Sequence, residues 1–127
     1  MKPLLFLLFV FLFSPLSLAE TKACGSSELD IHKTGEWEST RFIITVINGN
    51  DDMKLVLKSV DYVSQYCEKD IKGQNKILIL AICGGSGCSE STYIVIDART
   101  LMVELVPFRG QGNLEQVEEI LGREIKR

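Results

Sequence analysis

Hydrophobic and polar residues alternate along the chain in a pattern that predicts several short strands. The segments richest in β-branched, aliphatic and aromatic residues, a composition typical of strands, are 41–47, 77–83, 92–96 and 101–106. Because segment 77–83 contains no polar residue, we expect it to lie centrally in a sheet that is covered on both faces. Residues 97–100 predict a turn between the last two strands, with Asp97 in a turn role rather than an acid–base role.

Two other segments space their apolar residues at intervals of three and four, which is typical of one face of a helix. The first predicted helix begins after Asn50, a residue suited to an N-cap, and runs for about 18 residues toward Gly73. Its buried stripe would be Met53, Val56, Val60, Val63 and Cys67. The second helix begins at Asn113, with Gln116 placed to complete a capping box. Its buried stripe would be Leu114, Val117, Ile120, Leu121 and Ile125.

The order of these elements, β-α-β-β-β-α, predicts an α+β fold. A strand, a crossover helix and a second strand imply one parallel, right-handed pairing, and the hairpins that follow would be antiparallel. We therefore expect a mixed, mainly antiparallel sheet covered by two helices. The polar residues 20–40 are expected to form an N-terminal arm, and residues 41–127 a single α+β domain.

Residues 1–19 have the organisation of a secretory signal peptide. Lys2 supplies the positive charge, residues 4–13 form the apolar core, and Ser17 and Ala19 are small residues before the expected cleavage after Ala19. The uninterrupted apolar run is too short to span a bilayer, so we do not expect a membrane anchor after cleavage. A charged residue, Lys22, separates this run from Cys24, which disfavours lipidation. The mature protein is expected to be soluble and either periplasmic or secreted.

The cysteines at positions 24, 67, 83 and 88 are an even number, which favours two disulfides in an oxidising compartment. Four cysteines allow three pairings. Cys83–Cys88 is favoured because it would close a four-residue loop between two apolar segments, which leaves Cys24 to pair with Cys67 by elimination. A zinc site is disfavoured because the spacing lacks a C-x₂-C pair and His32 is the single histidine.

Charge and motifs argue against several classes of function. The 127 residues allow one domain, and 17 acidic against 14 basic side chains give a net charge of −3, the wrong sign for a nucleic-acid-binding protein. Ser86 is not in a G-x-S-x-G motif, and the glycines around it form neither a dinucleotide-binding nor a phosphate-binding motif. We therefore expect no enzyme activity and no cofactor.

The most distinctive segment is the loop Gly84, Gly85, Ser86 and Gly87 between Cys83 and Cys88. A bridge across its base would hold the loop rigid and lower the entropy lost on binding, which predicts a partner-binding loop flanked by Tyr93 and Arg99. The alternative is a hairpin turn that the bridge merely stabilises. Trp37, the sole tryptophan, is expected in the core rather than at an interface.

This segment and the sequence Ile-Val-Ile-Asp-Ala-Arg-Thr at 94–100 resemble a pattern in small exported bacterial proteins of unassigned function. The chain is more loosely similar to the Ivy-type periplasmic lysozyme inhibitors, which present a C-x₄-C loop between strands of an α+β domain to the lysozyme cleft. That resemblance places the family's cysteine pair at Cys83 and Cys88, and it implies an inhibitory role for the loop.

These observations predict an exported, non-catalytic binding or inhibitor protein that presents the loop to a protein partner, such as a cell-wall hydrolase or a toxin. One alternative is an envelope thiol–disulfide redox protein that uses Cys83 and Cys88. Another is a structural component of the envelope. The partner's identity and the oligomeric state stay open.

Overall fold

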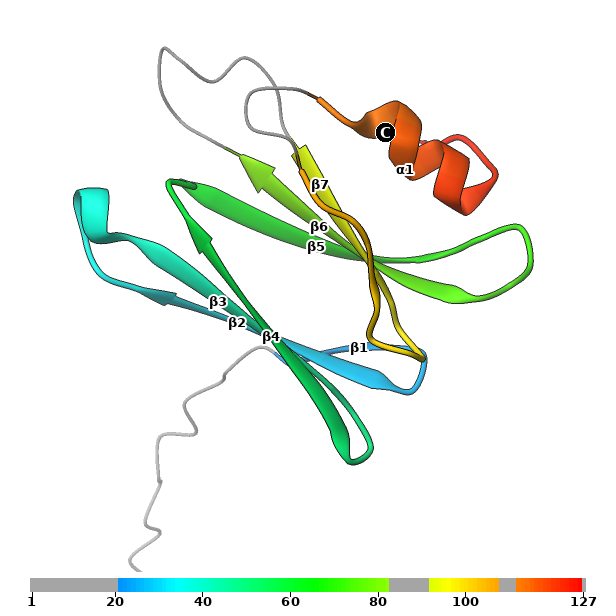
Figure 1. The fold of residues 1–127 in the computed structure, drawn as a ribbon, viewed down its shortest axis with the longest axis horizontal. Coiled ribbons are helices and arrows are strands. Elements are labelled where there is room, and N and C mark those ends of the chain that lie inside the picture. The colour runs from blue at the N-terminus through cyan, green and yellow to red at the C-terminus, as the bar shows by residue number, and fades with distance from the viewer. Residues whose placement is uncertain (1–20, 83–91, 108–111, 127) are drawn as a thin grey trace, which may run out of the picture.

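The computed structural model describes residues 21–82, 92–107 and 112–126. Within these ranges the chain forms two four-stranded antiparallel sheets and one α-helix (Figure 1). The first sheet has the order β1-β2-β3-β4, with bounds Lys22–Cys24, Ser27–Thr34, Arg41–Asn48 and Asp51–Lys58. The second sheet has the order β5-β6-β7-β8, with bounds Tyr62–Lys69, Asn75–Ile82, Thr92–Asp97 and Val103–Leu105. A short 3₁₀ turn, Trp37–Ser39, lies between β2 and β3, and α1 is Leu114–Leu121.

The molecule has three layers, which are the first sheet, the second sheet and α1 (Figure 1). The inner faces of the two sheets form one apolar core, which includes Ile44 and Val46 from β3 and Ile77 and Ile79 from β6. The outer face of the second sheet packs its Leu78 and other apolar residues against α1. Strand β6 is therefore central and covered on both faces, as segment 77–83 predicts.

The predicted strands are confirmed in position, since 41–47, 77–83, 92–96 and 101–106 correspond to β3, β6, β7 and the shorter β8. The final helix is also confirmed, with Val117 and Leu121 fully buried. The described part of residues 20–40, expected as an N-terminal arm, forms β1, β2 and the 3₁₀ turn, and both strands belong to the first sheet.

The predicted α+β fold with β-α-β-β-β-α order is wrong, because the segment after Asn50 forms β4 and β5 instead of a helix. Met53, Leu55 and Leu57 alternate at a period of two and pack against the core between the sheets. Asn48 and Asp51 close a two-residue turn around Gly49, whose φ is +61°. A two-residue Gly-Asn loop between apolar segments is a hairpin signal, and it agrees with the two strands that form here instead of a helix.

The predicted parallel pairing is also wrong. Every strand pairing in the described ranges is antiparallel, and β3 and β6 belong to different sheets. A strand that continues directly into a hairpin needs no crossover helix, so the geometry that favours a parallel pairing does not arise.

Cys24 of β1 and Cys67 of β5 form a disulfide, with 5.4 Å between their Cα atoms. The pairing predicted by elimination is confirmed, although Cys67 lies on a strand and not on a helix. The bond joins an edge strand of the first sheet to an edge strand of the second, so it ties the two layers together. Cys83 and Cys88, and with them the second predicted disulfide, lie outside the described residues.

Trp37 is 92% exposed at the turn between β2 and β3, so the expectation of a core position is wrong. The turn places Trp37 at a φ of +55°, directly after Gly35 and Glu36.

Of the helices in the part of the chain that the structure describes, none is long and apolar enough to cross a membrane.

Candidate binding site

The structure separates the described residues of the predicted binding surface. Tyr93 is the second residue of β7, whereas Arg99 follows the end of this strand. Arg99 is six positions after Tyr93, which corresponds to roughly 20 Å of extended chain. The two residues line different cavities. The predicted loop residues Gly84, Gly85, Ser86 and Gly87 lie outside the described ranges.

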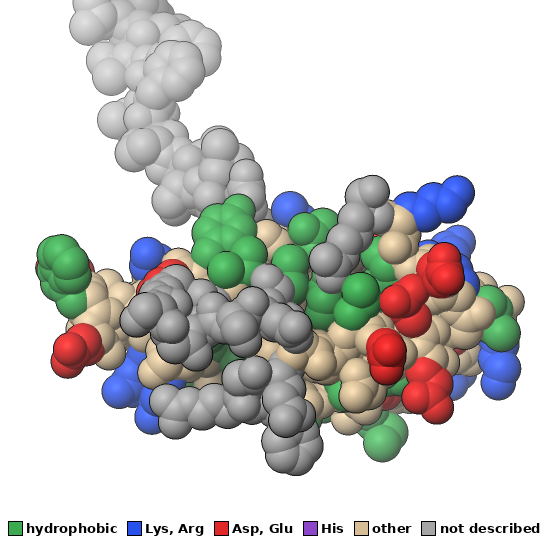
Figure 2. All heavy atoms as spheres, turned by 90° about the horizontal axis from the view of Figure 1, so that it is seen from above, with side chains coloured by type: hydrophobic (Ala, Val, Ile, Leu, Met, Phe, Trp, Pro, Cys, Tyr) green, Lys and Arg blue, Asp and Glu red, His purple; other side chains and the backbone are tan. Residues whose placement is uncertain are grey.

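Tyr93 lines an apolar groove of about 300 Å³ on the outer face of the second sheet. The residues of the apolar groove are Tyr66, Glu68, Leu78, Leu80, Tyr93, Ile125 and Lys126. Figure 2 views the molecule from above and shows exposed hydrophobic side chains near the middle, with acidic side chains gathered toward α1. The volume of the groove is at the lower end of the range for ligand-binding cavities.

The floor of the apolar groove consists of two cross-strand pairs on neighbouring strands. Tyr66 of β5 lies opposite Leu78 of β6, and Leu80 of β6 lies opposite Tyr93 of β7. The helix packs over β7 and β8, so the part of the floor on β5 and β6 is left open. Tyr66 is accordingly 48% exposed, whereas Tyr93 is buried.

The segment after α1 forms the opposite wall of the apolar groove, and it is firmly anchored. The Arg123 guanidinium pairs with the Glu68 carboxylate at 2.5 Å, and its Nε donates to the carbonyl of Lys69 at 2.8 Å. Gly122 ends the helix at a φ of +72°, and an added Cβ would lie 2.8 Å from the Ile71 side chain. Glycine at this position lets the chain turn closely past Ile71 and brings Ile125 to the groove.

Asn113 fixes the start of β7 beneath the helix. Its side-chain amide donates to the carbonyl of Tyr93 and accepts from the N–H of the same residue, both at 2.7 Å. Strand β8 pairs only with Val95 and Ile96, so the amide takes the place of a neighbouring strand. Asn113 is the N-cap residue by position, but its side chain does not cap the helix, so the predicted capping box is not formed.

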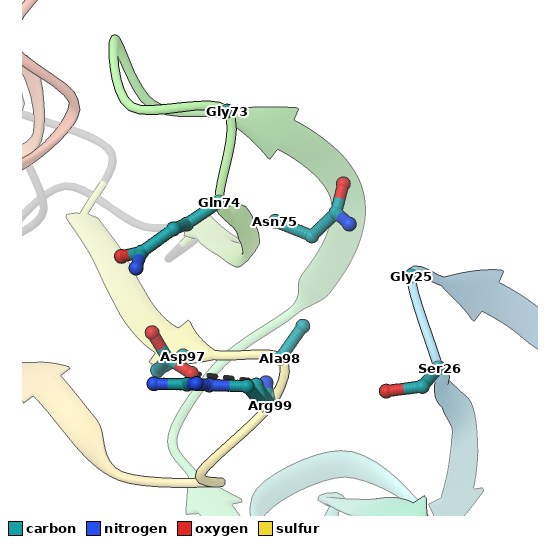
Figure 3. Close-up of a pocket in the computed structure, with 8 residues that line it drawn as sticks. All are labelled: Gly25, Ser26, Gly73, Gln74, Asn75, Asp97, Ala98 and Arg99. Atoms are coloured by element: carbon teal, nitrogen blue, oxygen red, sulfur yellow. Dashed lines mark hydrogen bonds between the residues drawn. The ribbon is translucent and has the colours of Figure 1, made fainter.

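Arg99 lines a second cavity, a polar pocket of about 250 Å³ (Figure 3). The residues of the polar pocket are Gly25, Ser26, Gly73, Gln74, Asn75, Asp97, Ala98 and Arg99. They come from the turns that follow β1, β5 and β7, which meet at one end of the sandwich.

The turn after β7 is held by side chains from both sheets. Asp97 Oδ1 accepts hydrogen bonds from the N–H groups of Arg99 and Thr100, both at 2.9 Å, which confirms its predicted turn role. The Ser27 hydroxyl donates to the carbonyl of Ala98. The Asn48 amide donates to the same carbonyl at 3.2 Å and to that of Arg99 at 2.8 Å.

Asp97 also belongs to a buried ion network across three strands. The Lys76 ammonium lies 2.7 Å from Asp97 Oδ2 and 2.6 Å from Glu104 Oε1. Burial alone would raise the pKa of Asp97, but hydrogen bonds from Lys76, Thr100 and Arg99 outweigh it and lower the pKa from 3.8 to about 2. Burial lowers the pKa of Lys76, yet its two carboxylate partners raise it overall. Through this one buried lysine the ion pairs link β6 to both β7 and β8.

The described residues contain no group of three His, Cys, Asp or Glu side chains that could hold a metal ion. The two cavities differ in the side chains and main-chain segments that line them. The polar pocket is lined by turns and strand ends with mostly polar groups, whereas the apolar groove has a floor of paired strands and an anchored wall. An apolar surface with a few polar groups at its rim is the usual form of a binding site, so the apolar groove is the better candidate.

Only Tyr93 of the apolar groove was identified from the sequence. The helix predicted after Asn50 conceals Tyr66, because Tyr62, Ser64, Tyr66 and Glu68 share one face only when the segment is a strand with a period of two. The sequence predicts Ile125 on the buried stripe of the last helix, and it packs there from the segment that follows α1.

A scan against protein-family models and searches of curated proteins and of solved structures find no match to this chain.

Proposed function

We propose that the chain is an exported, non-catalytic binding protein that uses the apolar groove to hold a side chain of a protein partner. The observation that carries the proposal is the half-exposed Tyr66 at the open side of the apolar groove, whose floor is made of paired strands and whose wall is anchored by Arg123. Rigid aromatic anchors lose little entropy on binding, which is why they are common at the centres of interfaces.

The lining of the apolar groove indicates the chemistry of the partner. The Glu68 carboxylate is already paired with Arg123, whereas Lys126 leaves a cation at the rim. We therefore expect the partner to insert an aromatic or aliphatic side chain and to place an acidic group near Lys126. A cell-wall hydrolase or a toxin with such a surface is the class of partner that the sequence suggests.

The Gly-rich segment 84–87 is the second contact in this proposal. It is joined to β6 and β7, and these strands contribute Leu80 and Tyr93 to the apolar groove close to the points where the segment is attached. The expected leader and the disulfide between the two sheets support export, because disulfides form and persist in oxidising compartments.

The test compares two substitutions on the same face of one edge strand. Tyr66 lies in the apolar groove, whereas Tyr62, which is 59% exposed, lies outside it. Partners are recovered from an envelope extract with the wild type, Tyr66→Glu and Tyr62→Glu. The proposal expects a partner that is bound by the wild type and Tyr62→Glu and lost with Tyr66→Glu.

Equal recovery of every partner by all three proteins would exclude the apolar groove as the partner-binding site. A Gly85→Arg, Ser86→Arg variant tests the loop separately in the same experiment. If neither surface affects recovery and the substitutions change only stability, the structural envelope role would be favoured instead.

A further inference from the structure

Strand β4 is a long open edge of the first sheet. Its eight residues pair with β3 on one side, and no element in the described ranges pairs with its other side (Figure 1). The opposite edge strand, β1, has three residues and is tied to β5 by the disulfide. A long edge strand presents a row of unpaired N–H and C=O groups that another strand can complete.

The two-residue turn between β3 and β4 determines which main-chain groups face this edge. Such a turn closes on a hydrogen-bonded pair, here Asn48 with Asp51, and hydrogen-bonded and non-hydrogen-bonded pairs then alternate along the hairpin. The free N–H and C=O groups are therefore those of Asp52, Lys54, Val56 and Lys58. The same four side chains point away from the core and are exposed.

The charges along this edge are self-complementary in one register. In a twofold antiparallel pairing centred on Leu55, Asp52 of each copy lies opposite Lys58 of the other, and Lys54 lies opposite Val56. Val56 is 49% exposed, and the aliphatic part of a lysine side chain can cover it.

The neighbouring registers are unfavourable. Centring the pair on Lys54 places two Lys54 side chains opposite each other, and centring it on Val56 places Lys54 opposite Lys58. Like charges directly opposite destabilise a strand pair, so among these three registers, which pair most of β4, only the one centred on Leu55 combines opposite charges without a repulsive pair.

We propose that the protein forms a twofold dimer in which the β4 strands of two copies pair antiparallel in this register. The first sheet then continues across both copies. The two apolar grooves stay open, because they lie on the outer face of the other sheet. The dimer thus presents two binding sites, a property that does not depend on what the apolar groove binds.

The test is a charge-reversal series followed by analytical ultracentrifugation over a range of protein concentrations. The wild type is expected to show a concentration-dependent monomer–dimer equilibrium. Asp52→Lys and Lys58→Asp each turn two attractive pairs into repulsive ones and are expected to weaken the dimer by roughly tenfold. The double variant D52K/K58D restores opposite charges and is expected to return to near the wild-type dissociation constant.

The rescue is specific to pairing between copies. Asp52 and Lys58 are six residues apart on one strand, roughly 20 Å, so they do not interact within one copy. A purely structural effect of either substitution would add in the double variant instead of cancelling.

A second variant tests the main-chain pairing. Val56→Pro removes an N–H that faces the edge, a position where proline is tolerated in a strand, and it is expected to be monomeric, whereas Val56→Thr still dimerises. A wild type that is monomeric at every concentration would overturn the proposal. So would a dimer that is unchanged by Val56→Pro, or a double charge variant no tighter than the single ones.

Discussion

The disulfide between Cys24 and Cys67 closes a loop of 43 residues that contains most of the first sheet. In the chain-entropy description, a loop of this length lowers the entropy of the unfolded chain enough to contribute about 4 kcal/mol to folding. This contribution is a large part of the 5–15 kcal/mol or so that stabilises a typical small domain. Removing the bond with Cys24→Ala, Cys67→Ala is therefore expected to lower the free energy of unfolding by about 4 kcal/mol.

Urea unfolding followed by circular dichroism measures this difference in the free energy of unfolding. The double variant leaves Cys83 and Cys88 in place, whereas a reductant acts on every disulfide, so comparing the two treatments separates their effects. The single variant Cys67→Ala should lose nearly as much stability as the double variant, because either change removes the bond. A loss below about 1 kcal/mol in the double variant would refute the view that this bond is a main tie between the layers.

Three further predictions concern the interior and the groove wall. Asp97 has a pKa of about 2 in the folded protein, below its ordinary 3.8. The ionised carboxylate therefore contributes about 2 kcal/mol to the free energy of unfolding above about pH 4, and this contribution is lost as the pH falls through 2. Urea unfolding across this range should show the loss in the wild type and not in Asp97→Asn; identical pH profiles would contradict the assignment. Asn113→Ala leaves the buried N–H and C=O of Tyr93 without their partner, so it should lower the free energy of unfolding by about 2 to 4 kcal/mol. Thermal unfolding measures this loss. A loss of only a few tenths of a kcal/mol would mean that water replaces the amide. Gly122→Ala should cost more stability than Gly73→Ala. Both residues have a similar positive φ, but only a Cβ at position 122 would contact a neighbouring side chain, that of Ile71. Equal costs would show that Ile71 moves aside without a loss of stability.

The parts of the fold that follow from local pattern could be predicted from the sequence. The wholly apolar segment 77–83 indicated a central strand, because a strand buried on both faces cannot carry polar residues. The last helix could be placed because its apolar spacing admits no alternative periodicity. The helix ends at Gly122, before Ile125, which the predicted stripe includes.

The segment from Asn50 to Lys69 could not be settled by periodicity alone. Its apolar residues fit both a helical stripe and the alternation of Met53, Leu55 and Leu57, and the choice depends on the core formed with distant strands. Only this long-range packing favours β4 and β5 over a helix. The same error concealed the apolar groove, because Tyr66 meets Leu78 only when both residues lie in one sheet.

Asn113 illustrates a second limit of the sequence. The residue type and position fit a helix cap, but its amide bonds to Tyr93, which is distant along the chain. A short polar side chain can satisfy several kinds of main-chain group, and which one it meets depends on the tertiary structure.

Site-specific photo-crosslinking in the cell envelope tests the proposed groove most directly. A photoreactive phenylalanine at Tyr66 would lie in the apolar groove, whereas one at His32, an exposed position on β2 of the first sheet, would lie on the other side of the molecule. The account predicts that position 66 forms a discrete crosslinked product with another envelope protein and that position 32 does not. No product at position 66, or the same product from both positions, would contradict it.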